Sequence, residues 1–189
     1  MPLCFIRKIE DITIGVWEID LGEKEEKRRD RETRNVLQLV EAMCHDKKTI
    51  AHLPSGKPYF TDHSYQISIS HAERYVAIAL SSAHPVGIDI EGMRKQVKKV
   101  QHKFLQEEEI ADITPTQELT HLLLYWCAKE SIYKRVDIEG LSLRENIRIH
   151  SFTPTKTGTF QGEVIHPLLN NKHTLFYWVE EDYILTLAE

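Results

Sequence analysis

The sequence predicts an α+β protein made of two similar halves, residues 1–84 and 85–189. A strand, helix, strand order occurs twice along the chain, and two pairs of short segments resemble each other in the same order. TIGVWEID resembles PVGIDIEG, because each places a glycine, Gly15 or Gly87, within an apolar strand. ERYVAIAL resembles EDYILTLA at the end of the chain. These two similarities favour a duplicated α+β unit.

The first half begins with a predicted strand at residues 12–19, which are dense in β-branched and aromatic side chains. No proline or glycine interrupts residues 23–43, and apolar side chains recur there at helical spacing: Val36, Leu37, Val40 and Met43. After the turn signal LPSGKP, the runs YQISIS and YVAIALS predict two strands joined by the short polar segment HAER. A strand, a helix and a hairpin are therefore expected.

The second half repeats this order with a longer helical part. HPVGIDIE predicts a strand, and a helical region is expected at about residues 97–136. Alternating apolar segments then predict four strands, near residues 146–152, 159–165, 174–180 and 183–188.

Composition excludes several classes of protein. The 189 residues are 41% hydrophobic and 28% charged, as in a globular domain. The longest apolar run, LLLYWCA, is far shorter than the roughly 20 residues of a membrane span. A formal net charge of -5 argues against a nucleic-acid partner, which would require a basic face.

The cysteines and the N-terminal segment predict a cytoplasmic protein. Cys4, Cys44 and Cys127 are odd in number and far apart, which indicates neither a disulfide framework nor a zinc knuckle. The apolar segment PLCFI is broken by Arg7 and Lys8 and is shorter than the apolar region of a secretory signal. We therefore expect no export.

Two carboxylates, Asp89 and Glu91, end the apolar strand in VGIDIEGM. Because successive strand side chains point to opposite faces, these two share one face while Ile88 and Ile90 take the other. Carboxylates a few ångströms apart repel each other and are costly to bury. The pair therefore needs either open solvent or a bound cation.

The segment LLLYWCAKESIYK has apolar residues at a spacing of three to four, which predicts a helix stripe in the core: Leu122, Leu123, Trp126 and Tyr133. Glu130 and Lys134 are four residues apart, so they are neighbours on this helix. Taken alone, they fit a surface ion pair worth a few tenths of a kcal/mol.

Together with the upstream segments GKPYF and SISHA, the motifs GIDIE and W-x-x-K-E-S-x-x-K resemble those of the 4'-phosphopantetheinyl transferase superfamily. The resemblance covers residues 24–143. The two pairs of similar segments match the surfactin-synthetase-activating type, in which one chain contains both halves. The resemblance thus implies the 4'-phosphopantetheinyl transferase fold, with a pseudo-two-fold axis between two α+β halves, and a monomer.

The resemblance also implies a metal site between carboxylates and the pyrophosphate of coenzyme A. The matching carboxylates offer hard oxygen ligands that suit Mg²⁺ or Mn²⁺: Asp89, Glu91 and Glu130. Three further residues match phosphate contacts of the family: Lys134, His71 and Ser70. Without the resemblance, Ser70 and His71 would merely end a strand, and Lys134 would be solvated.

By the same resemblance, residues 1–84 contact the nucleotide of coenzyme A, and residues 85–189 supply the metal carboxylates and the catalytic helix. Lys57 in SGKP matches a lysine near the 3'-phosphate. The charged run EKEEKRRDRETRN resembles a basic segment that contacts the same phosphate, which points to Lys24, Lys27 and Arg34. A solvated helix face is the alternative there, since acids and bases nearly balance.

Of four more positions, three match the family pattern and one departs from it. Glu109 matches a glutamate that precedes the long helix, and Trp126 and Lys129 complete the helix motif. Trp126 is assigned to packing, and Lys129 to a carboxylate of the site or to phosphate. Glu139 stands where the family often has a lysine, which removes any contact of that lysine with the pantetheine arm or the partner.

The implied reaction transfers the 4'-phosphopantetheine arm of coenzyme A to a serine of a carrier protein and releases adenosine 3',5'-bisphosphate. The metal is the main catalyst, while Lys134 and His71 donate to the phosphate oxygens. Glu130 is the first choice to accept the serine proton, and Glu109 the second. The carrier can belong to fatty acid, polyketide or peptide synthesis.

The segment GMRKQVKKVQHKF contains basic residues without an acidic one: Arg94, Lys95, Lys98, Lys99 and Lys103. A basic rim would steer an acidic acyl or peptidyl carrier protein to the site. A plain solvated helix face is the alternative.

Two other functions remain open from the sequence. One is a non-catalytic module that binds coenzyme A or a nucleotide, although such a module has no need for three carboxylates and Lys134. The other is a metal-dependent phosphohydrolase, in which water rather than a serine attacks. In a purely structural protein, Asp89 and Glu91 would be idle surface charges.

Overall fold

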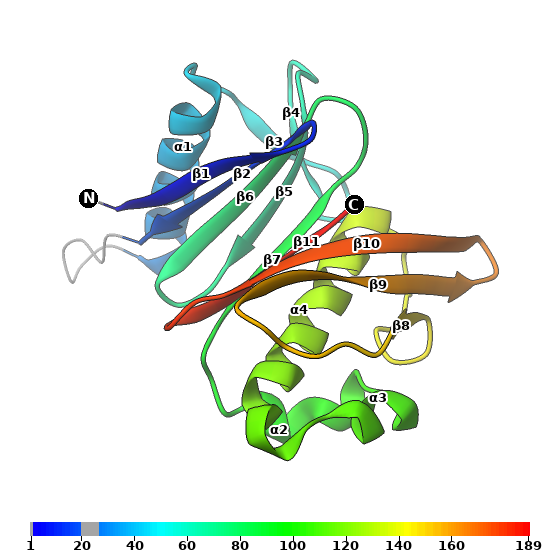
Figure 1. The fold of residues 1–189 in the computed structure, drawn as a ribbon. Coiled ribbons are helices and arrows are strands. Elements are labelled where there is room, and N and C mark those ends of the chain that lie inside the picture. Colours follow the sequence, from blue (N-terminus) through cyan, green and yellow to red (C-terminus); the bar gives the residue numbers. More distant parts are fainter. Residues whose placement is uncertain (1, 20–26) are drawn as a thin grey trace.

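The computed structural model describes residues 2–19 and 27–189, and it contains two antiparallel sheets, each covered by a helix (Figure 1). The first sheet has the strand order β1-β2-β6-β5. Its strands are β1 (Leu3–Ile9), β2 (Ile12–Glu18), β5 (Gln66–His71) and β6 (Tyr75–Ser81). A separate two-stranded ladder pairs β3 (Ile50–His52) with β4 (Pro58–Phe60).

The second sheet has the order β7-β11-β10-β9-β8. Its strands are β7 (Gly87–Gly92), β8 (Ile147–Ile149), β9 (Thr157–His166), β10 (Leu169–Val179) and β11 (Tyr183–Ala188). β7 lies beside β5 of the first sheet, and the Ile88 amide donates to Ser68 Oγ at 3.0 Å. The predicted α+β class is confirmed, whereas the pseudo-two-fold relation and the boundary between the halves stay predictions.

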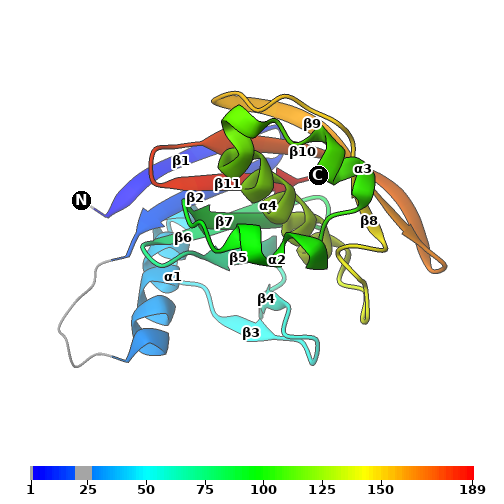
Figure 2. The same cartoon turned by 90° about the horizontal axis from the view of Figure 1, so that it is seen from below.

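Three hydrophobic clusters hold these elements together. Helix α1 (Arg28–Cys44) packs Val36, Leu39 and Val40 on one face of the first sheet. Helix α4 (Glu118–Val136) covers one face of the second sheet (Figure 2). Side chains from both sheets, such as Ile14 and Ile88, share the third cluster. The two sheets therefore pack on each other through this third cluster, and each helix forms a further cluster with its own sheet.

The structure differs from the sequence prediction at several elements. Strands β1, β3 and β4 were not predicted, and Leu37 of the predicted α1 stripe is 44% exposed. The single helical region expected at residues 97–136 is interrupted. It consists of α2 (Val97–Val100), η1 (Gln101–Lys103), α3 (Glu107–Asp112), η2 (Pro115–Gln117) and α4. Pro115 explains one break, because it forces Thr114 into an extended conformation.

Most other predicted elements are present, with ends that differ from the expected ones by no more than five residues. The start expected for the first helix, at residue 23, lies outside the described residues, and α1 is described from Arg28. None of the helices in the described part of the chain is long and apolar enough to cross a membrane.

Gly87 permits the close approach of β7 and α4. A Cβ atom at this position would lie 1.8 Å from the Ser131 carbonyl oxygen, which belongs to the α4 backbone. Gly87→Ala is therefore expected to destabilise the protein by about 1–3 kcal/mol or more, because α4 has to move. The free energy of unfolding in urea measures this.

Gly92, in the same strand, offers a matched control. A Cβ atom there meets nothing closer than the Asp182 carbonyl oxygen at 3.9 Å. Gly92→Ala is expected to change the unfolding free energy by less than about 0.5 kcal/mol. Equal effects of the two substitutions would show that the contact with α4 does not limit the residue at position 87.

Candidate functional site

The centre of the candidate site is Asp89, in the middle of β7. The alternation of this strand places Ile88 and Ile90 in the core shared by the sheets, and Asp89 on the face that α4 covers. Asp89 is only 4% exposed. A carboxylate so buried requires compensating partners.

Lys134 and Ser70 supply those partners on one side of the carboxylate. Asp89 Oδ1 accepts from Lys134 Nζ at 2.7 Å and from Ser70 Oγ at 2.6 Å. Lys134 Nζ also donates to Ser70 Oγ at 2.9 Å and to the Ile88 carbonyl at 3.2 Å. The other oxygen, Asp89 Oδ2, is buried and has no hydrogen-bond partner among the described residues. One oxygen of Asp89 is thus left for an additional ligand.

Glu91 lies two residues further along β7, on the same face. Its Oε1 atom accepts from Trp126 Nε1 at 2.8 Å and from Arg94 Nη2 at 2.6 Å. Burial raises the pKa of Glu91, and the nearby Asp89 carboxylate raises it further, while Arg94 and Trp126 oppose the shift. The charge of Asp89 therefore disfavours the charged form of Glu91 on the same face of the strand.

The third carboxylate, Glu130, comes from α4. Trp126, Glu130 and Lys134 follow each other at intervals of four residues, so the helix presents all three on one side. Burial, with Asp89 next in importance, raises the pKa of Glu130 to about 7, although Lys134 opposes the shift. Within the described residues, the Glu130 side chain makes no hydrogen bond or ion pair, which leaves both its oxygens available.

These residues fit a hard divalent cation. Asp89 Oδ2 is buried without a partner, and the pKa values of Glu91 and Glu130 are raised partly by the other carboxylates, which a cation would relieve. Among the described residues, these three do not bring a ligand atom each within 4.8 Å of one another. To bind the ion, the Glu91 carboxylate would have to give up its hydrogen bond from Arg94.

Two cavities meet at His71, the last residue of β5. The first, of about 700 Å³, lies beside Glu91 and is also lined by Arg28, Arg74 and Arg94; we call it the carboxylate cavity. The second, of about 540 Å³, lies between α1 and β3 and is called the α1 cavity. His71 thus faces both spaces.

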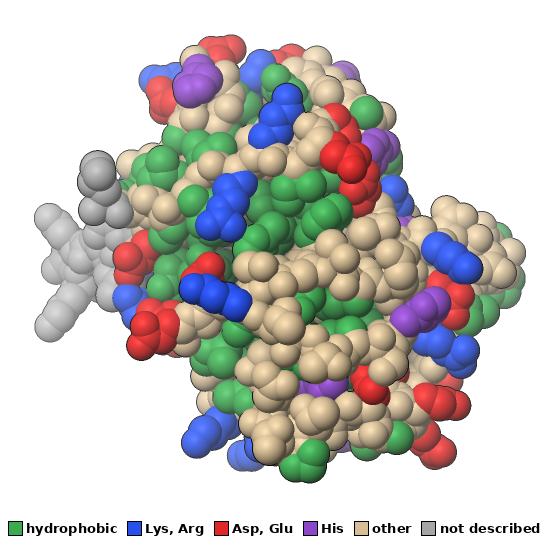
Figure 3. All heavy atoms as spheres, viewed as in Figure 1, with side chains coloured by type: hydrophobic (Ala, Val, Ile, Leu, Met, Phe, Trp, Pro, Cys, Tyr) green, Lys and Arg blue, Asp and Glu red, His purple; other side chains and the backbone are tan. Residues whose placement is uncertain are grey.

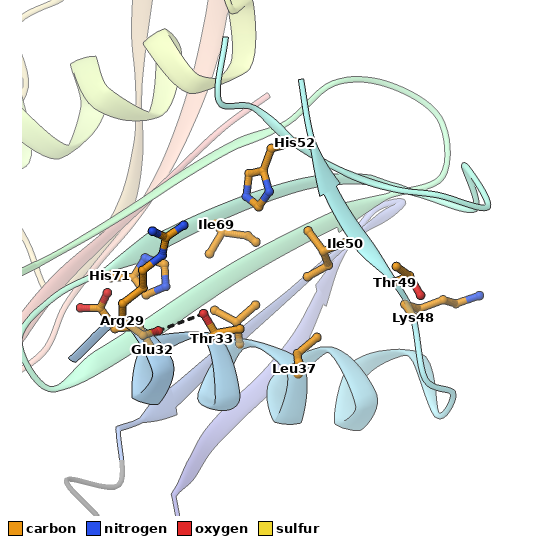
Figure 4. Close-up of a pocket in the computed structure, with 11 residues that line it drawn as sticks. Arg29, Glu32, Thr33, Leu37, Lys48, Thr49, Ile50, His52, Ile69 and His71 are labelled. Carbon is orange, nitrogen blue, oxygen red and sulfur yellow. Dashed lines mark hydrogen bonds between the residues drawn. The ribbon is translucent and has the colours of Figure 1, made fainter. Parts of the chain in front are cut away.

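The α1 cavity has an apolar floor and a polar rim (Figure 4). Arg29, His52 and His71 point into it, and Ile50 and Ile69 form its floor, whereas Lys48 extends away. Although the His71 imidazole is exposed, the cavity walls partly desolvate it and lower its pKa. The Lys134 and Arg28 cations act in the same direction, and Glu32 opposes them.

None of the described basic residues predicted for the nucleotide lines the carboxylate cavity or the α1 cavity. Lys57 lines a third cavity, of about 200 Å³, together with Lys134, and donates to the Arg135 carbonyl at 3.4 Å. Lys27 is the exposed N-cap residue of α1, and Arg34 lines a separate hollow on the α1 surface. Lys24 lies outside the described residues.

The cations of this charged run that face the two large cavities are Arg28 and Arg29, and not the residues that the sequence had suggested for a phosphate contact. Arg28 lines the carboxylate cavity and Arg29 the α1 cavity. They belong to the same charged run as Arg34, but consecutive helix residues differ by about 100° in direction. Only the packing of α1 on its sheet determines which of these cations face the cavities, so charge pattern alone could not have identified them.

Glu109 is not brought to the carboxylates of the site. It is 3% exposed and pairs with Lys129 Nζ at 2.7 Å, and its other oxygen accepts from the Ile149 amide at 2.9 Å. Lys129 also donates to the Leu143 and Ile147 carbonyls. Both residues connect α3, α4 and β8 inside the second half, which places Lys129 away from any phosphate contact at the site.

Trp126 packs, as expected, edge-on against Phe104, with ring centroids 5.1 Å apart. Its hydrogen bond to Glu91 was not anticipated and gives it a second role, to fix the position of that carboxylate. The N–H group of a partly buried indole needs a hydrogen-bond acceptor. This requirement could have indicated from the sequence that Trp126 has a polar partner.

The basic segment after β7 is mostly exposed. Four of its cations are exposed to solvent: Arg94, Lys95, Lys99 and Lys103. Lys98 is half-buried and forms an ion pair with Glu118 at the start of α4. Arg94 is engaged by Glu91, so Lys95, Lys99 and Lys103 remain the cations of this segment without an ion pair among the described residues.

Comparison with known proteins gives consistent matches. The family model of the 4'-phosphopantetheinyl transferase superfamily matches residues 85–188. The chain is 34% identical over 92 residues to a 4'-phosphopantetheinyl transferase of Bacillus subtilis, which is 47% of this chain and 40% of that protein. It is 33% identical over 84 residues to the 4'-phosphopantetheinyl transferase gsp of Aneurinibacillus migulanus, which is 43% of this chain and 35% of that protein. The matches thus span less than half the length of these relatives.

Proposed function

The chain belongs to the 4'-phosphopantetheinyl transferase superfamily, and we propose that it transfers the 4'-phosphopantetheine arm of coenzyme A to a serine of an apo carrier protein. Adenosine 3',5'-bisphosphate is the other product. The observation that carries the proposal is the placement of Asp89 and Glu91 on the face of β7 that meets α4, which carries Glu130 and Lys134, with Glu91 lining a cavity of about 700 Å³.

The cavities suggest a position for coenzyme A. We assign the nucleotide to the α1 cavity, where an apolar floor can contact the base and Arg29 can reach a phosphate. The pyrophosphate then lies near His71, which donates a hydrogen bond to its oxygens, and near the positive charge of Lys134, whose three N–H groups donate to Ser70, the Ile88 carbonyl and Asp89. Lys57, in the cavity next to Lys134, is left for the 3'-phosphate.

Asp89, Glu91 and Glu130 would hold a magnesium ion, or manganese. When bound, the ion would neutralise negative charge on the pyrophosphate. Lys134 stabilises charge on the same oxygens, and its hydrogen bonds to Asp89 and Ser70 hold it in place. Glu130, which α4 presents on the same side as Lys134, accepts the proton of the attacking serine, directly or through water.

We propose that the exposed lysines after β7 guide an acidic carrier protein to the carboxylate cavity. Lys95→Glu combined with Lys99→Glu is expected to lower the association rate with the carrier by about tenfold or more at low salt, because electrostatic attraction becomes repulsion. Stopped-flow fluorescence at several ionic strengths measures this rate.

Lys156→Glu combined with Lys172→Glu, at two exposed lysines away from this segment, serves as the control for the added charge. Coenzyme A affinity is expected to stay unchanged in both proteins. If the control slows carrier association as much as Lys95→Glu combined with Lys99→Glu does, overall charge rather than this segment steers the partner.

The proposed activity is tested by the intact mass of an apo carrier protein after incubation with this protein, coenzyme A and magnesium. A gain of one phosphopantetheine group that EDTA abolishes is the expected result. Carriers of fatty acid, polyketide and peptide synthesis are compared to identify the natural class. Coenzyme A binding without any mass gain would favour a binding module, and phosphate release without a carrier would favour a hydrolase.

We also propose that the protein is cytoplasmic and monomeric. Sedimentation velocity tests its oligomeric state.

A further inference from the structure

A second group of ligand-type side chains lies away from the carboxylate cavity. It joins Asp11 in the turn between β1 and β2, His84 in the connection between β6 and β7, and Glu189 after β11. One possible ligand atom of each residue lies within 4.8 Å of the others. Acidic and histidine side chains gather on the surface where the β1–β2 turn meets the C-terminal end (Figures 1 and 3).

The distances inside this group leave room for an ion. His84 Nδ1 lies 3.8 Å from Asp11 Oδ2, and His84 Nε2 lies 3.7 Å from Glu189 Oε1. Both distances are too long for hydrogen bonds. One ion can bind only one of the two imidazole nitrogens, so only one of these distances joins two of its ligands. Ligands of a tetrahedral ion lie roughly 3.4 Å apart. Since one atom of each residue lies within 4.8 Å of the others, the side chains would have to approach each other by about 1 Å.

A buried polar atom points to a missing ligand. His84 Nε2 is inaccessible to water and has no hydrogen-bond partner among the described residues. The side chains of His84, Asp11 and Glu189 nevertheless remain 33%, 32% and 23% exposed. An ion could therefore enter from solvent and keep water as a further ligand.

The Asp11 side chain and the backbones of His84 and Glu189 are held in place by contacts within the protein. Ser81, which is fully buried, donates to Asp11 Oδ2 at 2.7 Å and accepts from the His84 amide at 3.3 Å. Glu189 exchanges two backbone hydrogen bonds with Thr174. Arg135 acts electrostatically on Glu189 but forms no ion pair with it, since its guanidinium is turned to His173. These contacts bring the three residues together without an ion, and the His84 and Glu189 side chains are left to adjust to one.

We propose that Asp11, His84 and Glu189 bind a divalent transition-metal ion of the zinc class, at a site distinct from the three carboxylates of the proposed reaction. One imidazole nitrogen and two carboxylates favour such an ion over magnesium, which prefers oxygen ligands. The ligands come from the first sheet, the connection between the sheets and the end of the second sheet. The bound ion would tie the two sheets together.

Co²⁺ is a suitable probe, because its visible absorption reports coordination geometry. The intact protein is titrated with Co²⁺ in the presence of millimolar Mg²⁺, and Zn²⁺ is tested in parallel for its effect on the melting temperature. One equivalent of Co²⁺ is expected to bind, and Zn²⁺ is expected to raise the melting temperature. His84→Gln and, separately, Glu189→Gln are expected to weaken Co²⁺ binding at least tenfold.

Two control variants separate this site from others. His102→Gln removes an exposed histidine of η1, and Asp89→Asn removes a carboxylate of the proposed active site. Both are expected to keep the affinity for Co²⁺ of the unmodified protein. The proposal is overturned if both His84→Gln and Glu189→Gln bind Co²⁺ as tightly as the unmodified protein. A thiolate charge-transfer band would overturn it too, by assigning the ion to cysteine.

Discussion

Glu130→Gln is expected to lower phosphopantetheine transfer by about 10²–10⁴-fold, the range that loss of a positioned proton acceptor produces. The substitution keeps the size of the side chain but removes its ability to take a proton and its charge toward a cation. Single-turnover transfer to an apo carrier, followed by mass, measures the effect. Glu107→Gln, at an exposed position of α3, is the control and is expected to change the rate by less than twofold. A Glu130→Gln protein with unchanged rate and magnesium dependence would contradict the assignment of this residue.

The same substitution is expected to stabilise the metal-free protein at neutral and higher pH. The pKa of Glu130 is raised from 4.5 to about 7 in the fold. Between these pH values the native state binds more protons than the unfolded state, so the unfolding free energy falls as the pH rises. The shift corresponds to a loss on the order of 2–3 kcal/mol. Glutamine does not titrate, and so this part of the decline disappears.

Urea unfolding at pH 5 and pH 8 in EDTA separates the two effects of Glu130→Gln. The unmodified protein is expected to lose more stability between these values than the variant does. The raised pKa of Glu91 adds a decline of the same sign to both proteins, so the comparison isolates Glu130. Equal pH dependence in the two proteins would mean that Glu130 titrates normally in the fold.

The sequence was sufficient to predict which side chains share a face, because that follows from the period of one element. The alternation of β7 placed Asp89 and Glu91 together, and the four-residue spacing of α4 placed Glu130 beside Lys134. The hydrogen bonds between Lys134, Asp89 and Ser70 depend on β5 and β7 lying side by side. No local pattern fixes that arrangement, since it arises when the two sheets pack on a common core.

The same distinction explains the elements that the sequence did not predict. Strand β1 is mostly exposed, and its side chains therefore do not alternate between polar and apolar. The α1 cavity exists because β3 lies across from the first half of α1, and three-residue strands such as β3 and β4 carry too little periodicity to be recognised. Glu109 was expected near the site on a motif, whereas its burial beside Lys129 is a property of packing.

Lys129→Met is expected to destabilise the protein by about 3–5 kcal/mol, because it leaves the Glu109 carboxylate buried without its partner. The side chains of Lys129 and Glu109 are 0% and 2% exposed, so water cannot replace the lost ammonium group. The Leu143 and Ile147 carbonyls lose a donor as well. The free energy of unfolding in urea measures the cost. Lys134→Met, which removes the more exposed lysine of the same helix, is expected to cost less.

Glu109→Gln combined with Lys129→Met is expected to recover much of this loss, because a neutral amide is less costly to bury than an unpaired carboxylate. The amide oxygen can still accept from the Gln106 or Ile149 backbone. The single Glu109→Gln variant then decides whether Glu109 is a proton acceptor in the reaction. A general base replaced by glutamine would lose about 10²–10⁴-fold in rate. A residue that only joins α3, α4 and β8 would change stability and leave the rate per folded molecule nearly constant. We expect the second result, since the carboxylate oxygens of Glu109 are occupied by Lys129 and by backbone amides and none of its contacts involves Asp89, Glu91 or Glu130.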